Sequence, residues 1–239
     1  MGKGRTSTYF QHTYFLLMDS SQGKALFWIG FITLLGLAAY AVWGTAHKAT
    51  TTDDGQVNLL VPVSESDHRA GPMGAPVTIV EYADFECPSC QAYAPVLSQL
   101  VKEYPQNVQF VYRYFPLPQH PNAVPSARAA EAAGLQGKFW EMHDLLFANH
   151  AEWETQTNPS EVFKKYATQL GLDTARFETD YTSKAVIDRV SKDANDAATN
   201  KLSYTPTIFL NGVRIQTPGT YEALKAAVEA AMKPATTTP

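Results

Sequence analysis

The longest apolar stretch of the chain lies near its N-terminus. Residues 25–46 (ALFWIGFITLLGLAAYAVWGTA) contain no charged side chain. A helix over this stretch extends about 33 Å, and the hydrocarbon core of a bilayer is about 30 Å thick. The pattern therefore predicts a transmembrane signal-anchor over residues 25–46, preceded by a cytoplasmic segment over residues 1–24.

The charges on either side of this stretch predict its orientation. The flank before it is basic and the flank after it is acidic, with Lys3, Arg5 and Lys24 followed by Asp53 and Asp54. Because positive flanks stay on the cytoplasmic side, we expect a single-pass protein of the cell membrane with its C-terminal part on the extracytoplasmic (periplasmic or extracellular) side. Two other interpretations stay open: a signal peptide cleaved near residues 39–41, and a buried core helix.

Polar segments flank the part of the chain that is expected to fold. Residues 47–55 are polar and lack periodicity, which predicts a tether. Residues 57–63 have the pattern of a short edge strand, although Pro62 weakens it, and tether and strand together belong to residues 47–75. Residues 234–239 (PATTTP) lack an apolar anchor and are expected to form a disordered tail.

Between these segments, residues 76–233 show the pattern of one α/β domain. Residues 77–85 form a β-branched run that is typical of a strand buried on both faces. Residues 91–104 carry apolar positions at helical spacing, and residues 108–115 alternate like a strand. The domain therefore begins in the order strand, helix, strand.

The second half of the domain is predominantly helical. Residues 122–200 have helical patterns that are broken at 134–137, 158–159 and 171–173. They make up a helical insertion over about residues 117–203. Asn211-Gly212 predicts a final hairpin, and residues 221–232 a closing helix.

Composition and charge exclude several classes of protein. Hydrophobic residues make up 45% of the 239 residues and charged residues 18%, which is enough apolar material to exclude a wholly disordered chain or a coiled coil. The net charge is -4, about +3 up to residue 48 and about -7 after it. Nucleic-acid binding is not expected, because phosphate recognition needs a concentrated Lys/Arg surface.

Both cysteines lie in one motif, Cys87-Pro88-Ser89-Cys90, where a predicted strand meets a predicted helix. A thiolate at a helix N-terminus faces unpaired N–H groups and the positive end of the helix dipole, which stabilise it by up to about 2 kcal/mol. The pKa of Cys87 is therefore expected below that of a free thiol. Cys90 lies one turn further on and is more shielded. This arrangement is typical of dithiol–disulfide exchange, in which Cys87 reacts first and Cys90 resolves.

Two other roles remain for the pair. Half a zinc site is one, but no second C-x-x-C and no histidine pair at zinc-binding spacing accompanies it. A structural disulfide is the other, since oxidising compartments favour such bonds. So short a spacing, however, closes almost no loop and restrains the unfolded chain little. Exchange is the favoured interpretation, and no metal is expected.

The motif and its surroundings resemble a known family. Residues 77–95 (VTIVEYADFECPSCQAYAP) resemble the active-site strand and helix of the thioredoxin superfamily, and in particular of the DsbA-like thiol-disulfide oxidoreductases. Glu81 stands where thioredoxins keep a buried carboxylate, and Pro95 where they have a helix-kinking proline. Residues 203–212 (SYTPTIFLNG) resemble the segment that holds the cis-proline of the family.

The resemblance extends to most of the exported part. Residues 115–123 (FPLPQHPNA) and 137–144 (GKFWEMHD) resemble the helical insertion of DsbA-like proteins. In all, the resemblance covers about residues 68–232. It implies an α/β thioredoxin fold with an inserted helical domain, behind one N-terminal transmembrane helix.

The resemblance also implies which residues form the site. Cys87 and Cys90 are the redox-active pair, and no further cofactor is expected. Pro206 is implied to be cis, so that the main chain of Thr205 meets a substrate peptide beside Cys87. The dipeptide Pro88-Ser89 is expected to border that peptide.

Other polar residues near the motif have expected roles as well. Glu81 is implied to take or relay the proton of Cys90, the alternative being a solvent-facing or ion-paired glutamate. Asp84 and Glu86 are expected to be surface charges that slightly oppose thiolate formation. His120 is expected to act in capping or turn packing, and the apolar residues of 139–147 in the core of the insertion or partly in a substrate groove.

The expected function is an extracytoplasmic oxidoreductase that introduces disulfides into reduced exported polypeptides. Strongly oxidising DsbA proteins often carry a histidine between the cysteines, whereas this chain has Pro88-Ser89, so a membrane-tethered reductase or isomerase stays an alternative. No dimerisation region is recognisable, so a monomer is expected, with a membrane partner of the DsbB or VKOR type that recycles it. Alternatives of another class are a chaperone and a metallochaperone for copper(I) or zinc.

Overall fold

The computed structural model describes residues 57–233. The predicted cytoplasmic segment 1–24, transmembrane helix 25–46, tether 47–55 and tail 234–239 lie outside the described residues. Within residues 57–233, no helix is both long and apolar enough to cross a membrane.

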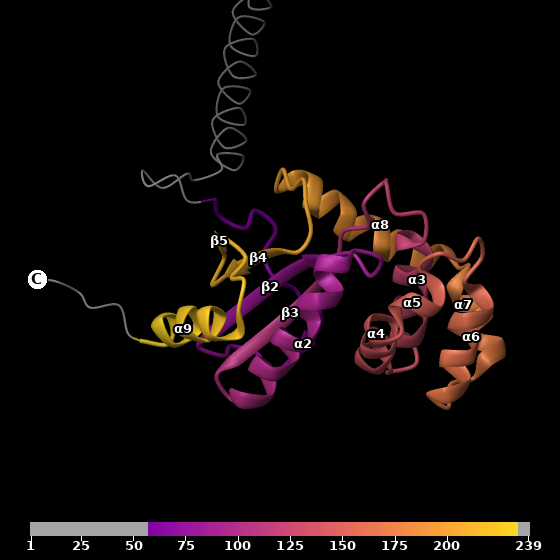
Figure 1. The fold of residues 1–239 in the computed structure, drawn as a ribbon, viewed down its shortest axis with the longest axis horizontal. Coiled ribbons are helices and arrows are strands. Elements are labelled where there is room, and N and C mark those ends of the chain that lie inside the picture. The colour runs from indigo at the N-terminus through magenta and orange to yellow at the C-terminus, as the bar shows by residue number, and fades with distance from the viewer. Residues whose placement is uncertain (1–56, 234–239) are drawn as a thin grey trace, which may run out of the picture. The chain divides into compact units, whose positions relative to one another are not determined.

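A five-stranded sheet forms the centre of the described domain, in the order β1-β3-β2-β4-β5 (Figure 1). The two middle strands, β2 (Val77–Ala83) and β3 (Val108–Tyr114), run parallel, and every other pairing is antiparallel. β1 (His68–Ala70) pairs with β3, whereas β4 (Thr207–Leu210) and β5 (Val213–Ile215) extend the other side of the sheet. All of β3 and nearly all of β2 are buried, as expected for parallel strands covered on both faces.

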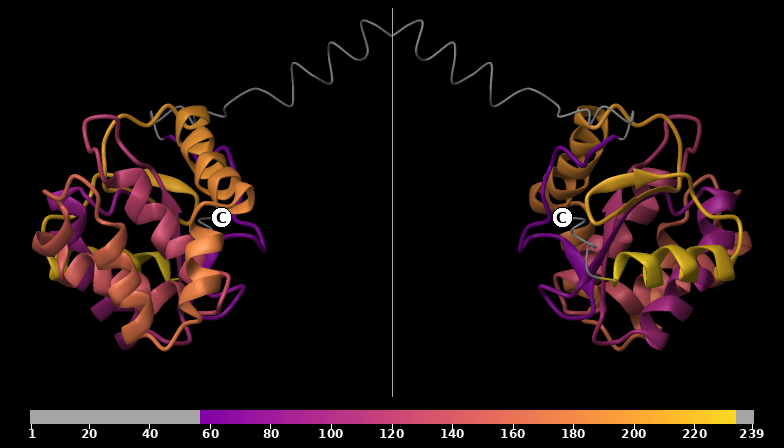
Figure 2. Two further views of the ribbon diagram at one scale, coloured as in Figure 1. Left: turned by 90° about the vertical axis from the view of Figure 1, so that its right-hand side faces the viewer. Right: turned by 90° about the vertical axis from the view of Figure 1, so that its left-hand side faces the viewer.

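Two helices lie outside the insertion and pack with the sheet. α2 (Pro88–Glu103) connects β2 to β3, and α9 (Tyr221–Ala231) packs against α2. The remaining helices form the insertion between β3 and β4: α3 (Ala123–Gly134), α4 (Phe139–Ala148), α5 (His150–Trp153), α6 (Ser160–Gln169), α7 (Thr174–Tyr181) and α8 (Lys184–Thr199). They gather beside one end of the sheet, and α8 leads the chain back toward β4 (Figures 1 and 2).

The predicted edge strand over residues 57–63 is wrong in its extent. Only Asn58 forms a β-bridge, with Val213. Beyond it, the Arg113 guanidinium donates hydrogen bonds to the carbonyls of Val61 (2.9 Å) and Pro62 (2.8 Å). Because a side chain uses these carbonyls and proline lacks an N–H, the segment cannot continue as a strand. The edge position beside β3 is taken by β1, which the pattern did not predict.

The predicted hairpin is confirmed at its turn. Asn211 and Gly212 have φ values of 48° and 81°, the left-handed pair that a two-residue hairpin turn requires. The Asn211 side chain also accepts a hydrogen bond from the backbone N–H of Thr78 at 2.7 Å. This bond ties the turn to β2 and fixes β4 beside the strand that carries the cysteine motif.

Candidate active site

The two cysteines lie where β2 ends and α2 begins. Cys87 is the N-cap residue of α2, with extended backbone, and Pro88 follows in the first turn. Cys90 lies one turn further and is fully buried, whereas Cys87 keeps 7% of its surface exposed. Pro88 and Ser89 are exposed. The motif therefore leaves a small part of Cys87 exposed and buries Cys90 completely.

The surroundings of the two sulfurs drive their pKa values apart. Both residues are thiols in this structure. A hydrogen bond from the Cys90 thiol, with further ones from Thr205 and from the backbone N–H groups of Cys90 and Ser89, lowers the pKa of Cys87 to about 4 against the effect of burial. Burial raises the pKa of Cys90 well above its ordinary value. At neutral pH the accessible sulfur is a thiolate and the buried one holds its proton.

The loop before β4 lies against the accessible sulfur. The Thr205–Pro206 peptide bond is cis, as the resemblance implies. The Cys87 sulfur lies 3.7 Å from the Thr205 carbonyl oxygen. Both Thr205 and Pro206 are buried, while Tyr204 beside them is 48% exposed. The fold thus brings Cys87 and Thr205 together from positions more than a hundred residues apart.

Glu81 lies below the cysteines on β2. It pairs with Tyr112 of β3 and Ile208 of β4 in the sheet register, and it is 2% exposed. Burial, reinforced by the negative charge of Cys87, raises the pKa of this carboxyl to about 8. The solvent-facing alternative is therefore wrong, and near neutral pH Glu81 is a carboxylic acid that is able to release or take up a proton.

Asp84 and Glu86 are not surface charges, and that expectation is corrected here. Their exposures are 2% and 8%. Asp84 accepts hydrogen bonds from the backbone N–H groups of Glu86 (2.9 Å) and Leu117 (2.9 Å), and its carboxylate lies 2.7 Å from Nδ1 of His120. Burial nevertheless raises the pKa of Asp84. The segment that follows β3 covers the cysteine turn and buries this carboxylate.

Glu86 makes a second connection between the cysteine turn and the insertion. Its carboxylate accepts a hydrogen bond from the backbone N–H of Asn122 at 2.5 Å, and its carbonyl oxygen lies 2.9 Å from Nε2 of His150. Burial raises the pKa of Glu86. His120 and His150 therefore act in packing around the turn. Local sequence spacing carries no signal for these contacts, because each partner lies more than thirty residues away along the chain.

The apolar face of α4 forms part of the core, as one of the two sequence interpretations predicts. The buried residues of this helix are Phe139, Met142, His143, Leu146 and Phe147. Trp140 is half-buried and donates a hydrogen bond from Nε1 to the Arg69 carbonyl at 3.0 Å. Within residues 57–233, no three His, Cys, Asp or Glu side chains come together as a group that could hold a metal ion.

The fold and the motif together define the class of protein. The domain has a DsbA-like thioredoxin fold. Its features are a five-stranded sheet with a parallel middle pair, a Cys-x-x-Cys motif at the start of α2 and a helical insertion before the cis-proline. A family model described as Thioredoxin matches residues 63–230. The chain belongs to the thioredoxin family.

Two solved structures show the likeness in three dimensions. One is oxidised BdbD from Bacillus subtilis, with 22% identity, a TM-score of 0.64, and coverage of 72% of this chain and 95% of that one. The other is a thioredoxin-like oxidoreductase from Silicibacter pomeroyi, with 26% identity, a TM-score of 0.61, and coverage of 72% and 95%. Both alignments include nearly the whole of the compared protein.

Sequence relatives carry another name. The Na(+)/H(+) antiporter NhaA 3 of Salinispora tropica is 43% identical over 188 residues, which cover 78% of this chain and 28% of the antiporter. The Na(+)/H(+) antiporter NhaA of Herminiimonas arsenicoxydans is 38% identical over 194 residues, 81% of this chain and 30% of the antiporter. The chain thus matches less than a third of the length of these relatives.

Proposed function

We propose that the protein is an extracytoplasmic thiol-disulfide oxidoreductase that introduces disulfides into reduced exported polypeptides. The observation that carries this proposal is the contrast between the sulfurs: Cys87 is a stabilised thiolate that keeps 7% of its surface exposed, and Cys90 is a fully buried thiol next to it. That contrast is what a disulfide donor needs. A stable Cys87 thiolate favours the reduced pair, so the oxidised pair gives up its disulfide readily.

The exchange takes place in two steps. A substrate thiolate attacks Cys87 in the oxidised pair, so that the Cys87–Cys90 bond breaks and a bond between Cys87 and the substrate sulfur forms. A second substrate thiolate then attacks the first substrate sulfur and displaces Cys87 as a thiolate. The substrate loses two electrons and gains a disulfide, while the pair is reduced and Cys90 takes up one proton.

Two neighbouring groups support these steps. The Thr205 backbone beside the Cys87 sulfur would hold the extended substrate, with Pro206 and the exposed Pro88-Ser89 edge around it. Glu81 would exchange the proton of Cys90, since both groups are buried and the charge of Glu81 acts on Cys90. In these roles Cys87 and Cys90 are the catalytic pair, and Glu81 is a proton carrier.

The cellular setting is part of the same proposal. A single-pass anchor over residues 25–46 would hold the domain on the extracytoplasmic side, as a monomer, where a DsbB-type or VKOR-type membrane partner reoxidises the pair. Ion transport is not proposed, because the match covers only 28% of the length of the antiporter.

The direction of exchange is tested by the redox equilibrium of the full chain in detergent with glutathione, read by alkylation. We expect a reduction potential nearer the disulfide-donating end, about -120 mV, than that of thioredoxin at about -270 mV. A Cys87→Ser, Cys90→Ser double variant should show no exchange with glutathione. A value near the thioredoxin end would replace the oxidase by a tethered reductase. Chaperone activity that survives in the double variant would indicate a function independent of the cysteines.

A further inference from the structure

One aromatic side chain is exposed beside the reactive sulfur. Tyr204 is 48% exposed, and within residues 57–233 it is the only exposed aromatic residue. It directly precedes Thr205, whose carbonyl oxygen lies 3.7 Å from the Cys87 sulfur. The most exposed aromatic ring of the described domain therefore belongs to the loop that borders the site of exchange.

The backbone that carries Tyr204 is held in place on both sides. The Thr207 hydroxyl donates a hydrogen bond to the Tyr204 carbonyl at 2.7 Å, and the Thr217 hydroxyl donates one to the Pro206 carbonyl at 3.1 Å. Two positions before Tyr204, Leu202 packs against buried hydrophobic residues. The side chain of Tyr204 therefore starts from a fixed point, as a group that recognises another molecule should.

The fold itself makes no use of the Tyr204 side chain. The residue belongs to neither hydrophobic core cluster. Within the described part of the chain, no hydrogen bond of its hydroxyl and no aromatic contact of its ring is formed. A single exposed hydrophobic residue is ordinary on a protein surface. What sets Tyr204 apart is the combination of a free ring, a fixed backbone and a place next to Cys87.

The exposed residues that flank Cys87 carry no charge. Pro88 and Ser89 follow it at the start of α2, and Ser203 and Tyr204 lead to the loop on its other side; all four are exposed. The acids that precede Cys87 along the chain are buried. The surface around the sulfur therefore offers apolar contact to a substrate and no partner for a charged side chain.

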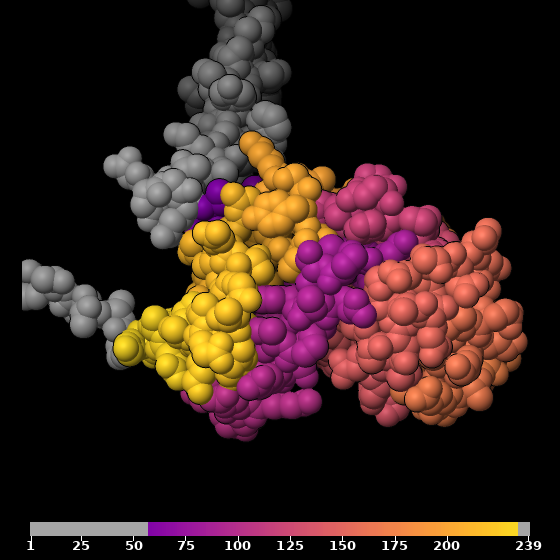
Figure 3. All heavy atoms as spheres, viewed as in Figure 1, coloured from indigo at the N-terminus to yellow at the C-terminus, as the bar shows by residue number. Residues whose placement is uncertain are grey.

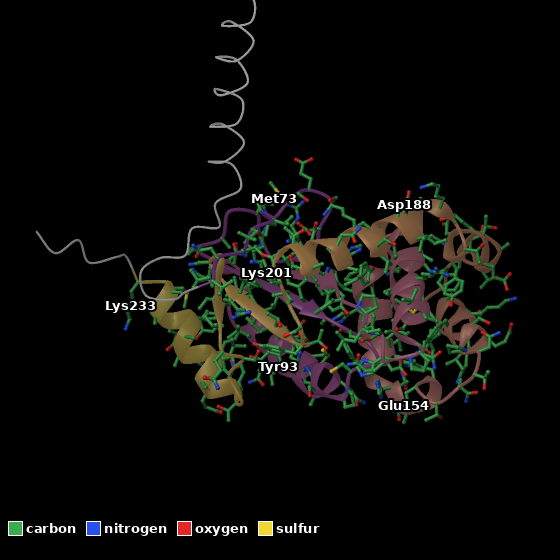
Figure 4. All side chains as sticks on the ribbon, turned by 90° about the horizontal axis from the view of Figure 1, so that it is seen from above. Met73, Tyr93, Glu154, Asp188, Lys201 and Lys233 are labelled. Atoms are coloured by element: carbon green, nitrogen blue, oxygen red, sulfur yellow. The ribbon has the colours of Figure 1, made fainter. Side chains whose placement is uncertain are left out.

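The two segments that border the sulfur can be followed in the figures. Figure 3 shows the beginning of α2 at the surface, beside the segment that leads from α8 to β4. Figure 4 labels Tyr93 on α2 and Lys201 at the start of the other segment. Lys201 is the nearest charged residue to Tyr204 along the chain, three positions before it.

A substrate bonded to Cys87 brings its own chain to this surface. An S–S bond is about 2.05 Å long, so the substrate cysteine lies against the Thr205 backbone. Residues one or two positions away from that cysteine lie near Tyr204, because consecutive Cα atoms are only about 3.8 Å apart. An apolar side chain at such a position removes part of the Tyr204 ring from water, whereas a charged one loses hydration without gaining a partner.

We propose that Tyr204 is a specificity residue of the exchange reaction, which favours reduced polypeptides with an aromatic side chain within two positions of the reacting cysteine. The inference rests on the proposed function and names a substrate class for the same site. Aromatic pairs gain stability beyond the area that they bury, so a tyrosine selects such a side chain more strongly than another apolar residue does. Cys87 and Cys90 perform the exchange, and Tyr204 decides which polypeptides reach them fastest.

The test measures disulfide transfer from the oxidised full chain, in detergent, to reduced two-cysteine peptides of Gly and Ser. Four peptides carry one Phe at position −2, −1, +1 or +2 from each cysteine, and a fifth carries Ser at all of them. Acid quench and mass spectrometry give the second-order rate constant. In the wild type we expect the best Phe peptide to react about fivefold faster than the Ser peptide. Tyr204→Phe should keep this preference, and Tyr204→Ser should reduce it below about twofold.

Glutathione and a second variant separate recognition from a merely structural role. Glutathione has no aromatic side chain, so Tyr204→Ser should exchange with it at the wild-type rate and equilibrium, within about twofold. Met73→Ser is the matched control. Met73 is also apolar and is 65% exposed, but it precedes β2 whereas Cys87 follows the end of that strand (Figure 4). Its loss should leave the fivefold preference unchanged.

The outcomes distinguish this inference from the proposed function. If the wild type transfers no disulfide to glutathione or to any peptide, the oxidoreductase proposal fails and the specificity role fails with it. If transfer occurs but no Phe position is preferred, or if the preference survives in Tyr204→Ser, only the specificity role is overturned. A Tyr204→Ser protein that is equally slow with glutathione would show that Tyr204 supports the loop, which also overturns it.

Discussion

Glu81 and Asp84 are two buried acids on and just after the same strand, and their surroundings are opposite. Asp84 has two backbone N–H donors and the His120 ring around its carboxylate. Glu81 faces a cavity, and near it the hydroxyls of Tyr93 and Tyr112 also lack partners among residues 57–233. Buried polar groups that are fully paired hold a fold together. Unpaired ones persist where their chemistry is used.

Fully hydrogen-bonded buried polar groups are also found on the other face of the sheet. Arg113, fully buried in β3, donates to both carboxylate oxygens of Asp67 at 2.9 and 3.0 Å and to the Tyr82 hydroxyl at 2.8 Å. These bonds lower the pKa of Asp67 even though burial, the largest effect on it, raises that pKa. The domain therefore separates a polar framework around Asp84 and Arg113 from an unpaired pocket around Glu81.

The largest effect is expected from breaking the framework at Arg113. Arg113→Met leaves the Asp67 carboxylate buried without its partner, which costs about 3–5 kcal/mol of unfolding free energy. Urea unfolding followed by circular dichroism measures the loss. A cost below 1 kcal/mol would show that the pair does not hold the fold.

Glu81→Gln, in contrast, should stabilise the folded protein. The folded pKa of about 8 lies above the unfolded value of 4.5, so Glu81 costs no stability below pH 4.5 and costs increasingly more as pH rises toward 8. The amide removes this cost, which is about 3 kcal/mol at pH 7. Unfolding curves of both proteins at pH 5, 7 and 9 should diverge with rising pH, and parallel curves would contradict an unpaired, buried Glu81.

Asp84→Asn should destabilise the protein by about 2 kcal/mol. An amide offers one oxygen to donors that now share two, so a buried N–H, that of Leu117 or Glu86, loses its acceptor. Thermal unfolding at pH 7, measured for Asp84→Asn and Glu81→Gln in parallel, shows whether each variant is less or more stable than the wild type. A change in the same direction for both variants would remove the distinction between paired and unpaired acids.

The smallest effect is expected from Thr205, which lies beside the Cys87 sulfur. The Thr205 hydroxyl has no hydrogen-bond partner among the described residues. It nevertheless helps to lower the pKa of the Cys87 thiol. Thr205→Val should raise that pKa and make the reduced pair about fivefold less favoured in the glutathione equilibrium, about 1 kcal/mol. Thiolate absorbance between pH 3 and 8 gives the pKa directly, and an unchanged value would exclude the hydroxyl as a donor to the thiolate.

The sequence predicts one side of this comparison far better than the other. Strand β2, helix α2 and the Asn211-Gly212 turn follow from local periodicity and turn chemistry, and the cysteine motif from its spacing. The framework does not follow from local patterns. Asp84 and Glu86 have the appearance of surface charges until the chain after β3 folds over them. Two of the Arg113 partners, the carbonyls of Val61 and Pro62, come from a segment whose pattern indicated a strand.

The hydrogen bonds from Arg113 to the carbonyls of Val61 and Pro62 also have a mechanical consequence. Leu59, Leu60 and Val57 are bonded in turn to Gly212, Asn200 and Arg214. Tension applied through the chain before residue 57 is thus shared among several bonds in different directions, instead of peeling β1 away from β3. A pull from that end would load the bonds of Val57 and Leu59 to the β4–β5 hairpin before it reached the guanidinium of Arg113.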